Sequence, residues 1–197
     1  MINFLFGSPI FVFDHPEDTA EYISLETEKI SSNFKKSPLS NPWSGNILTT
    51  FSQEGNNNII TNFCPLLNSY ILKSIHLFLK ELQVEPNYSV INIYDSWINY
   101  GEFGMYQETH SHPYADISGV FYSQAEENCG DIYFIAPSSA YCHSELIFRS
   151  KILTDNIKIQ PKKNRLVLFP SWLQHGTLPN KSNDTRVSIS FNIKLIP

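Results

Sequence analysis

The sequence lacks the features by which several classes of protein are recognised. Its 197 residues carry a net charge of −5 and contain no long run of lysine or arginine. We therefore expect no surface that follows a phosphate backbone, and no nucleic acid partner. No apolar stretch approaches the roughly 20 residues that cross a bilayer, so we expect no membrane-spanning segment.

Cysteine is also scarce. The chain has an odd number of cysteines, widely spaced and without a Cys-x-x-Cys pair, namely Cys64, Cys129 and Cys142. This usage favours reduced thiols over a disulfide framework. The apolar start, MINFLFGSPIFVF, has neither a basic beginning nor a small-residue cleavage site. We interpret it as one or two strands, not as a signal peptide, and we predict a cytoplasmic protein.

The chain is rich in aromatic residues, at 14%, beside 42% hydrophobic and 17% charged residues. This composition is typical of a compact globular protein and not of a disordered one. A chain of this length fits one domain. We predict a single domain over residues 1–197, in which 1–87 provide helical support and outer strands and 88–197 form the β core.

Two helices are predicted in the first half of the chain. The segment 14–36, DHPEDTAEYISLETEKISSNFKK, has acids near its start and lysines at its end, an order that suits a helix dipole. A second segment carries apolar residues at helical spacing: Leu66, Leu67, Tyr70, Ile71, Ile75, Leu77, Phe78 and Leu82. It predicts a buried amphipathic helix that ends before Pro86.

The texture changes from Tyr88 onward. Short runs rich in β-branched and aromatic residues follow one another between turn residues: YSVINIYDSWINY, DISGVFY, DIYFIA, LIFRSKIL, RLVLF and TRVSISFNIKLI. This pattern predicts an antiparallel β-sandwich or barrel. We therefore predict a mainly β fold with an N-terminal helical layer packed on it.

Three of the six histidines form a candidate metal site. His110 and His112 stand one residue apart in THSHP, and residues i and i+2 of a strand share a face. His175, in LVLFPSWLQHG, follows a strong strand and can supply a third imidazole. Imidazole suits iron, zinc, copper and nickel. The other histidines are interpreted as ordinary core or surface residues: His15, His76 and His143.

A larger pattern surrounds these histidines. The segments NYGEFGMYQETHSHPYADISGVFY, GDIYF and RLVLFPSWLQHGTLPNKSNDTRVSISFNI resemble the iron(II)- and 2-oxoglutarate-dependent oxygenase superfamily over roughly residues 88–195. They are most similar to a branch of uncharacterised oxygenases with an H-x-H-P…S-G-V-x-Y and F-P-x-x-x-x-H core. The resemblance implies a double-stranded β-helix of the jelly-roll or cupin-like type. It also implies Fe(II), 2-oxoglutarate as cosubstrate, O2, and hydroxylation of an unidentified substrate.

The resemblance also assigns the metal ligands. The His-x-Asp/Glu…His triad of the superfamily falls on His110 and His175, while the position of the acid holds His112. Three arrangements stay open, of which we favour a site of three histidines. In the second, Asp116 or another acid supplies the carboxylate, and in the third, two histidines leave an open position.

The resemblance further indicates a cosubstrate anchor. Arg186 in TRVSISF matches the basic residue with which the superfamily binds the distal carboxylate of 2-oxoglutarate. A planar guanidinium grips a carboxylate with two hydrogen bonds. Ser188 would face the same way as Arg186. Similarity to the prolyl-hydroxylase-like branch implies that Tyr100 and Tyr122 donate hydrogen bonds to 2-oxoglutarate.

Two functions other than that of an oxygenase stay open. A cupin would use the same histidines with Asp116 as the acid, although Asn164 and Trp172 replace signature glycines. It would act as an isomerase, a dioxygenase independent of 2-oxoglutarate or a small-molecule binder, and it would leave Arg186 without a role. The other alternative is a metal-free binding module with structural histidines. For an oxygenase we expect a small molecule or a protein side chain as substrate, bound through loops such as 37–58 and 137–161.

Overall fold

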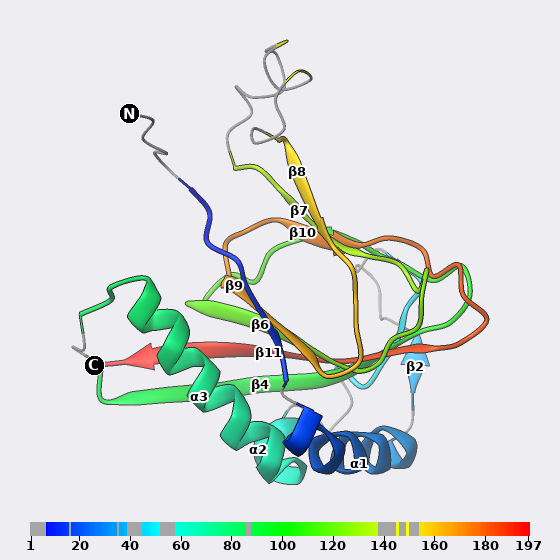
Figure 1. Cartoon of the computed structure of the whole chain (residues 1–197), viewed down its shortest axis with the longest axis horizontal. Coiled ribbons are helices and arrows are strands. Elements are labelled where there is room, and N and C mark those ends of the chain that lie inside the picture. Colours follow the sequence, from blue (N-terminus) through cyan, green and yellow to red (C-terminus); the bar gives the residue numbers. More distant parts are fainter. Residues whose placement is uncertain are drawn as a thin grey trace.

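The computed structural model describes residues 7–15, 17–34, 36–38, 45–51, 58–85, 88–137, 145, 149 and 154–197. The first six residues, Cys142, His143, most of LIFRSKIL and parts of the two predicted substrate loops lie outside these ranges. The described elements form three layers, with helices below a large sheet and a smaller sheet above it (Figure 1).

The helical layer contains the two helices predicted from the sequence together with one short helix. It consists of α1 (Glu17–Asn33), the short α2 (Ile59–Phe63) and α3 (Pro65–Glu81). Helix α3 begins with Pro65, whose missing N–H would have no helical partner at this position, and it ends before Pro86. Its buried face includes Leu67, Ile71 and Ile75. None of the described helices has the length and apolarity needed to cross a membrane.

The two sheets are antiparallel throughout their named pairs. The large sheet has the order β1 (Phe11–Asp14), β9 (Arg165–Pro170), β6 (Ile117–Gln124), β11 (Arg186–Ile196), β4 (Val90–Gly101), β3 (Leu48–Thr49) and β2 (Ser37–Pro38). The small sheet has the order β5 (Gln107–His110), β10 (His175–Thr177), β7 (Ile132–Ile135) and β8 (Asn156–Ile159). The predicted mainly β fold with a helical layer is confirmed.

Strand β11 shows how the large sheet separates the hydrophobic core from the interior cavity. Successive side chains of a strand point to opposite faces. One set packs in the core below the sheet, namely Val187, Ile189, Phe191 and Ile193. The alternate set lines a cavity above it, namely Arg186, Ser188, Ser190 and Asn192. The sheet therefore buries apolar residues against the helices and turns polar residues toward the small sheet.

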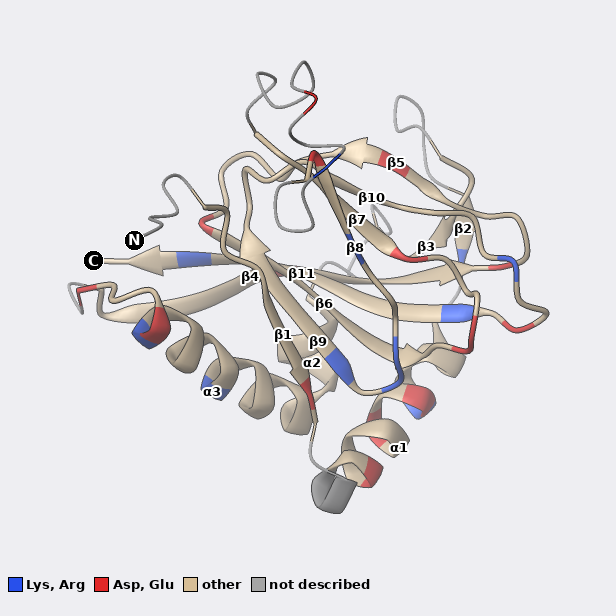
Figure 2. Cartoon of the chain, turned by 45° about the horizontal axis from the view of Figure 1, so that its top comes forward, with Lys and Arg blue, Asp and Glu red and all other residues tan. Residues whose placement is uncertain are grey.

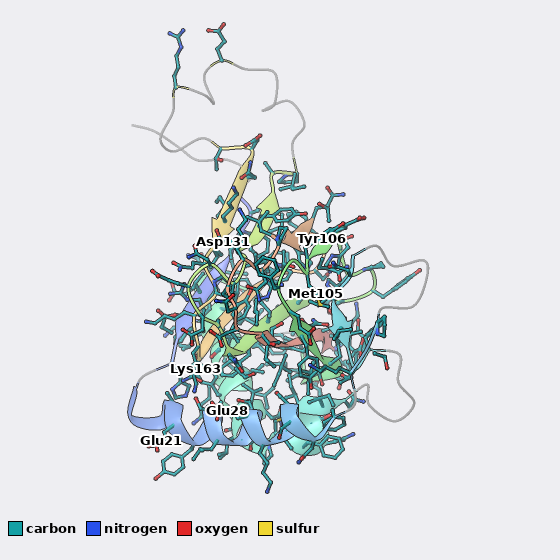
Figure 3. All side chains as sticks on the ribbon, turned by 90° about the vertical axis from the view of Figure 1, so that its right-hand side faces the viewer. Glu21, Glu28, Met105, Tyr106, Asp131 and Lys163 are labelled. Carbon is teal, nitrogen blue, oxygen red and sulfur yellow. The ribbon has the colours of Figure 1, made fainter. Side chains whose placement is uncertain are left out.

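Ion pairs join the start of β9 and the loop before it to β1 and α1. Lys163 Nζ lies 2.6 Å from Glu28 Oε1 on α1, and both residues are labelled in Figure 3. Arg165 donates two hydrogen bonds to Asp14, of 2.6 and 2.8 Å. Figure 2 shows acidic residues along α1. Because such pairs lie at the surface, each contributes at most about 1 kcal/mol to stability.

We predict that Gly119→Ala destabilises the fold through overpacking. A Cβ at Gly119 on β6 would overlap the ring of Phe191 and lie 2.8 Å from Leu168 Cδ2. Overpacking of a core typically lowers the free energy of unfolding by about 1–3 kcal/mol. Urea unfolding followed by circular dichroism measures the change. Gly7→Ala is the control because nothing lies within 4 Å of a Cβ there, and equal midpoints for the two variants would refute this view of the core.

Candidate metal centre and cosubstrate cavity

The structure brings His110, His112 and His175 together. His110 ends β5 and pairs in register with His175, the first residue of β10. His112 lies beyond the end of β5, where its backbone N–H donates to Ser171 O at 2.9 Å. The three ring centroids are 4.4 to 5.1 Å apart, and the candidate ligand atoms all lie within 4.8 Å of one another. The two histidines of THSHP therefore converge through a loop and not, as predicted, through one strand.

Backbone carbonyls orient two of the rings. His110 Nδ1 lies 2.8 Å from Glu108 O, and His175 Nδ1 lies 2.8 Å from Leu173 O. A protonated Nδ1 donates to such a carbonyl and leaves Nε2 as the lone-pair nitrogen. His112 Nε2 lies 3.3 Å from His175 Nε2. The donor set thus has the orientation of a metal site.

Burial keeps these imidazoles neutral. It lowers the pKa of His110, and it lowers the pKa of His112 to about 3, with a further contribution from the neighbouring His110. The pKa of His175 is well below its usual value, first because of burial and then because of the two other histidines. A neutral imidazole is the form that binds a metal ion, so the cluster fits a divalent cation.

Asp116 does not complete this cluster. Its Oδ1 accepts a hydrogen bond of 3.0 Å from Lys194 Nζ, and its Oδ2 accepts one of 2.8 Å from the backbone N–H of Leu195. Both oxygens therefore point to the end of β11. Among the described residues, no carboxylate joins the three histidines. The expectation that Asp116 can supply a ligand is wrong, because the strand pairing turns its side chain away.

Arg186 is buried beside the cavity, and no described carboxylate lies within ion-pair distance of its guanidinium. Its residue surface is 1% exposed. Nη1 donates to Cys129 O at 2.8 Å and to Gly130 O at 2.7 Å, and Nη2 donates to Thr177 Oγ1 at 3.1 Å. These partners are neutral, and no described carboxylate forms an ion pair with Arg186. A buried cation of this kind is costly unless a ligand supplies the negative charge, so the site fits a carboxylate.

Two glycines make room for the guanidinium. A Cβ at Gly101 would lie 3.1 Å from Arg186 Nη2, and one at Gly130 would lie 2.9 Å from Nη1. Gly130 also has a φ of +89°, a conformation that favours glycine. The sequence analysis did not find these residues, because their part in the site depends on approach to a distant arginine.

The predicted tyrosines occupy opposite faces of the large sheet. Tyr122 lines the cavity, and its buried hydroxyl has no hydrogen-bond partner among the described residues. Burial raises its pKa, so the hydroxyl keeps its proton. Ser188 also lines the cavity and is paired with Tyr122 across β11 and β6. A cosubstrate at this point would find two hydroxyl groups.

Tyr100 does not reach the cavity. Its hydroxyl donates to Ser31 O on α1 at 2.6 Å, and its ring belongs to the core between the helices and the large sheet. The neighbouring Asn99 lines the cavity instead. The expectation that Tyr100 binds 2-oxoglutarate is wrong, because the alternation of β4 turns this side chain to the other face.

The cavity between the sheets has a volume of about 380 Å³. This size is within the range of small-molecule sites. Its described walls include the three histidines, and they carry one arginine, Arg186, and one carboxylate, Asp95. Trp97, whose ring stacks on His112 with centroids 5.8 Å apart, belongs to the same wall. The sequence analysis missed Asp95 and Trp97.

Residues 95–192 match a family model described as "Putative 2OG-Fe(II) oxygenase". No curated protein sequence matches the chain. A Pseudomonas putida prolyl-4-hydroxylase has a similar structure, with a TM-score of 0.64 and 12% identity over 95% of this chain and 93% of that one. The matched region begins at Asp95 and includes the three histidines and Arg186.

Two further structures have the same fold. A Trichoplax adhaerens prolyl hydroxylase, in complex with a peptide of the hypoxia inducible factor oxygen degradation domain, has a TM-score of 0.63 and 12% identity over 93% of this chain and 82% of that one. HygX from Streptomyces hygroscopicus, with nickel, 2-oxoglutarate and hygromycin B bound, has a TM-score of 0.59 and 10% identity over 95% and 83%. These likenesses identify the fold as the double-stranded β-helix of 2-oxoglutarate oxygenases. The chain therefore belongs, through the region that carries its histidine cluster and buried arginine, to the family of 2OG-Fe(II) oxygenases.

Proposed function

We propose that this chain couples the oxidative decarboxylation of 2-oxoglutarate to the hydroxylation of a substrate C–H bond. In this proposal His110, His112 and His175 hold Fe(II), and Arg186 binds the distal carboxylate of 2-oxoglutarate. One observation carries the proposal: a single cavity has a cluster of three neutral imidazoles and a buried guanidinium without a counter-ion among the described residues. The family implies Fe(II), 2-oxoglutarate and O2.

The residues around the metal position would fix its geometry. Iron bound here would catalyse the reaction in which 2-oxoglutarate and O2 give succinate and CO2 and the second oxygen atom hydroxylates the substrate. The hydrogen bonds of His110 and His175 to backbone carbonyls hold both Nε2 atoms toward the cavity. Two aromatic rings shield the imidazoles from water. The ring centroid of Phe169 lies 4.5 Å from that of His175, and Trp97 stacks on His112.

The cosubstrate residues would bind one end of 2-oxoglutarate. Two carbonyls hold Nη1 of Arg186, which leaves Nη2, beside Thr177, as the donor for the distal carboxylate. Tyr122 and Ser188 add hydroxyl donors from the same wall. Because the guanidinium is already oriented by the protein, little side-chain entropy is lost when a carboxylate binds.

The two alternative functions explain less of this geometry. A cupin site would need Asp116 beside the histidines, and Asp116 is paired with Lys194 instead. A metal-free module would give no reason to bury Arg186 and the Tyr122 hydroxyl beside a cavity. As for the substrate, structures of the same fold include one bound to a peptide and one bound to hygromycin B. We propose a protein side chain or a small molecule as substrate of this chain.

Loss of one histidine should abolish iron binding. His175→Ala leaves two imidazoles, and a two-ligand remainder holds Fe(II) weakly, so we expect the iron content after anaerobic dialysis to fall to background. Iron is measured by inductively coupled plasma mass spectrometry. His76→Ala, on the exposed face of α3, is the control and should keep the iron of the unmodified chain. Full iron occupancy in His175→Ala would contradict the proposed ligand set.

Loss of the buried guanidinium should separate iron binding from cosubstrate binding. Arg186→Ala should keep Fe(II) but weaken 2-oxoglutarate binding by roughly 2–5 kcal/mol, the effect of truncating one partner of a buried charge pair. The affinity is measured under argon from the metal-to-ligand charge-transfer absorption. The exposed Arg149→Ala is the control. An unchanged affinity for 2-oxoglutarate in Arg186→Ala would defeat the assignment.

A pair of tyrosine variants tests which face of the sheet binds the cosubstrate. Tyr122→Phe removes a hydroxyl that has no described partner, so it should leave the free energy of unfolding unchanged or raised. It should lower the affinity for 2-oxoglutarate by about 0.5–1.5 kcal/mol, the worth of one hydrogen bond. Tyr100→Phe removes the hydrogen bond to Ser31 and should lower stability by about 1 kcal/mol without changing that affinity. Urea unfolding and charge-transfer titration give both quantities, and the reverse pattern would place the cosubstrate elsewhere.

A further inference from the structure

The two charged side chains of the cavity wall lie at opposite ends of the same face. In the ladder between β11 and β4, Arg186 is paired with Gly101 and Asn192 with Asp95. Arg186 and Asn192 are separated by six steps along β11, which corresponds to about 20 Å at the rise of an antiparallel strand. Asp95 is the single carboxylate among the described residues that line the cavity. The cavity thus has a positive end and a negative end.

A β-bulge directs two neighbouring residues of β4 to the negative end. The register passes from Asn192 paired with Asp95 to Ile193 paired with Ile93, which leaves Tyr94 as an extra residue. Consecutive residues of a regular strand would face opposite sides of the sheet. Here both Tyr94 and Asp95 line the cavity. Bulges of this kind are frequent beside active sites, where they re-aim side chains.

The Asp95 carboxyl lacks a positive partner. Its Oδ1 is buried and has no hydrogen-bond partner among the described residues, and no described lysine or arginine forms an ion pair with Asp95. Asn192, opposite it, accepts a hydrogen bond of 2.8 Å from Ser118 Oγ on its Oδ1, so its amide N–H group is left to face Asp95. Burial raises the pKa of Asp95, and hydrogen bonds from Asn192 and Ser96 oppose the shift. A hydrogen-bond donor from a ligand would offset the free-energy cost of burying Oδ1.

The negative end adjoins the histidine cluster. Trp97, two residues beyond Asp95 on the same face of β4, stacks on His112. Phe169, which is paired with Ser118 across β6 and β9, contacts the ring of His175. The histidines therefore lie over the half of the sheet that carries Asp95, and the proposed cosubstrate position lies toward Arg186. A molecule bound at Asp95 would have its neighbouring carbon atoms beside the proposed metal position.

We propose that Asp95 binds a cationic nitrogen of the prime substrate, an ammonium or a guanidinium group, and thereby selects a basic substrate for oxidation. The inference rests on the proposed function, because it assigns 2-oxoglutarate to the other half of the cavity. An ammonium or guanidinium supplies a positive charge beside the carboxylate and a hydrogen-bond donor for its buried Oδ1. Aromatic rings in the same wall, those of Phe51, Tyr94 and Trp97, favour cations over anions.

Calorimetric titration with matched pairs of probes tests this assignment. Chain loaded with Fe(II) and 2-oxoglutarate under argon is titrated with Nα-acetyl-L-lysine amide and its neutral analogue Nα-acetyl-L-norleucine amide, and with Nα-acetyl-L-arginine amide and its neutral analogue Nα-acetyl-L-citrulline amide, so that the side chain carries the only cationic nitrogen. We expect at least one cation to bind about tenfold or more tightly than its neutral partner, as one charge-assisted hydrogen bond provides. Asp95→Asn keeps the shape of the side chain and should remove that preference. Glu127→Gln, at an exposed turn, removes one negative charge elsewhere and should retain it.

The charge-transfer absorption of the same samples separates the two possible failures. If the band forms but the unmodified chain shows no preference for cations, or Asp95→Asn keeps the preference, the Asp95 assignment is overturned while the proposed function stands. If the unmodified chain forms no band, the proposed function fails and the inference with it. The band also reports whether Asp95→Asn is folded and binds its cosubstrate. If Asp95→Asn does not form the charge-transfer band, Asp95→Ser is used as a second neutral variant.

Discussion

The site depends on the pairing of β11 between β4 and β6. This register fixes which side chains of three strands face the helices and which face the small sheet. A slip of one residue would turn Arg186 into the apolar core and Phe191 into the cavity, because side chains alternate along a strand. The same hydrogen-bond ladder that buries the isoleucines of β11 therefore also determines the polar wall of the site.

The predictions from the sequence succeeded where one strand or one loop carried the information. The apolar periodicity of α3 and the β-rich second half follow from local patterns, whereas the convergence of His110 and His175 was expected from two strand ends and from the resemblance to the oxygenase superfamily. They failed for Asp116 and Tyr100, because the direction of a single side chain depends on partners far along the chain, Lys194 and Ser31. Sequence spacing does not specify such partners.

The sequence analysis missed three residues of the site for one physical reason. Gly101 and Gly130 matter because a guanidinium passes close to their backbones, and each is an ordinary turn or strand-end glycine in the sequence. Asp95 lies on the cavity face in alternation with Trp97 and Asn99, and a bulge brings the neighbouring Tyr94 to the same face, an irregularity that appears only in the register with β11. The close approach of a side chain to a distant backbone and a β-bulge both depend on two paired segments, so neither can be predicted from one segment alone.

Neither charged side chain of the cavity wall, Arg186 or Asp95, forms an ion pair with another described residue. Arg186 and Asp95 are separated by six steps of β11, roughly 20 Å by strand rise, which is too far for an ion pair between them. Burial of each charge lowers the free energy of unfolding, and in the proposed function each gains an oppositely charged partner when its ligand binds. Ligands that bind the folded state alone raise its stability. If the proposals hold, the free chain is therefore the less stable form. The two ends of the cavity then bind ligands of opposite charge, with the histidine cluster over the half that carries Asp95.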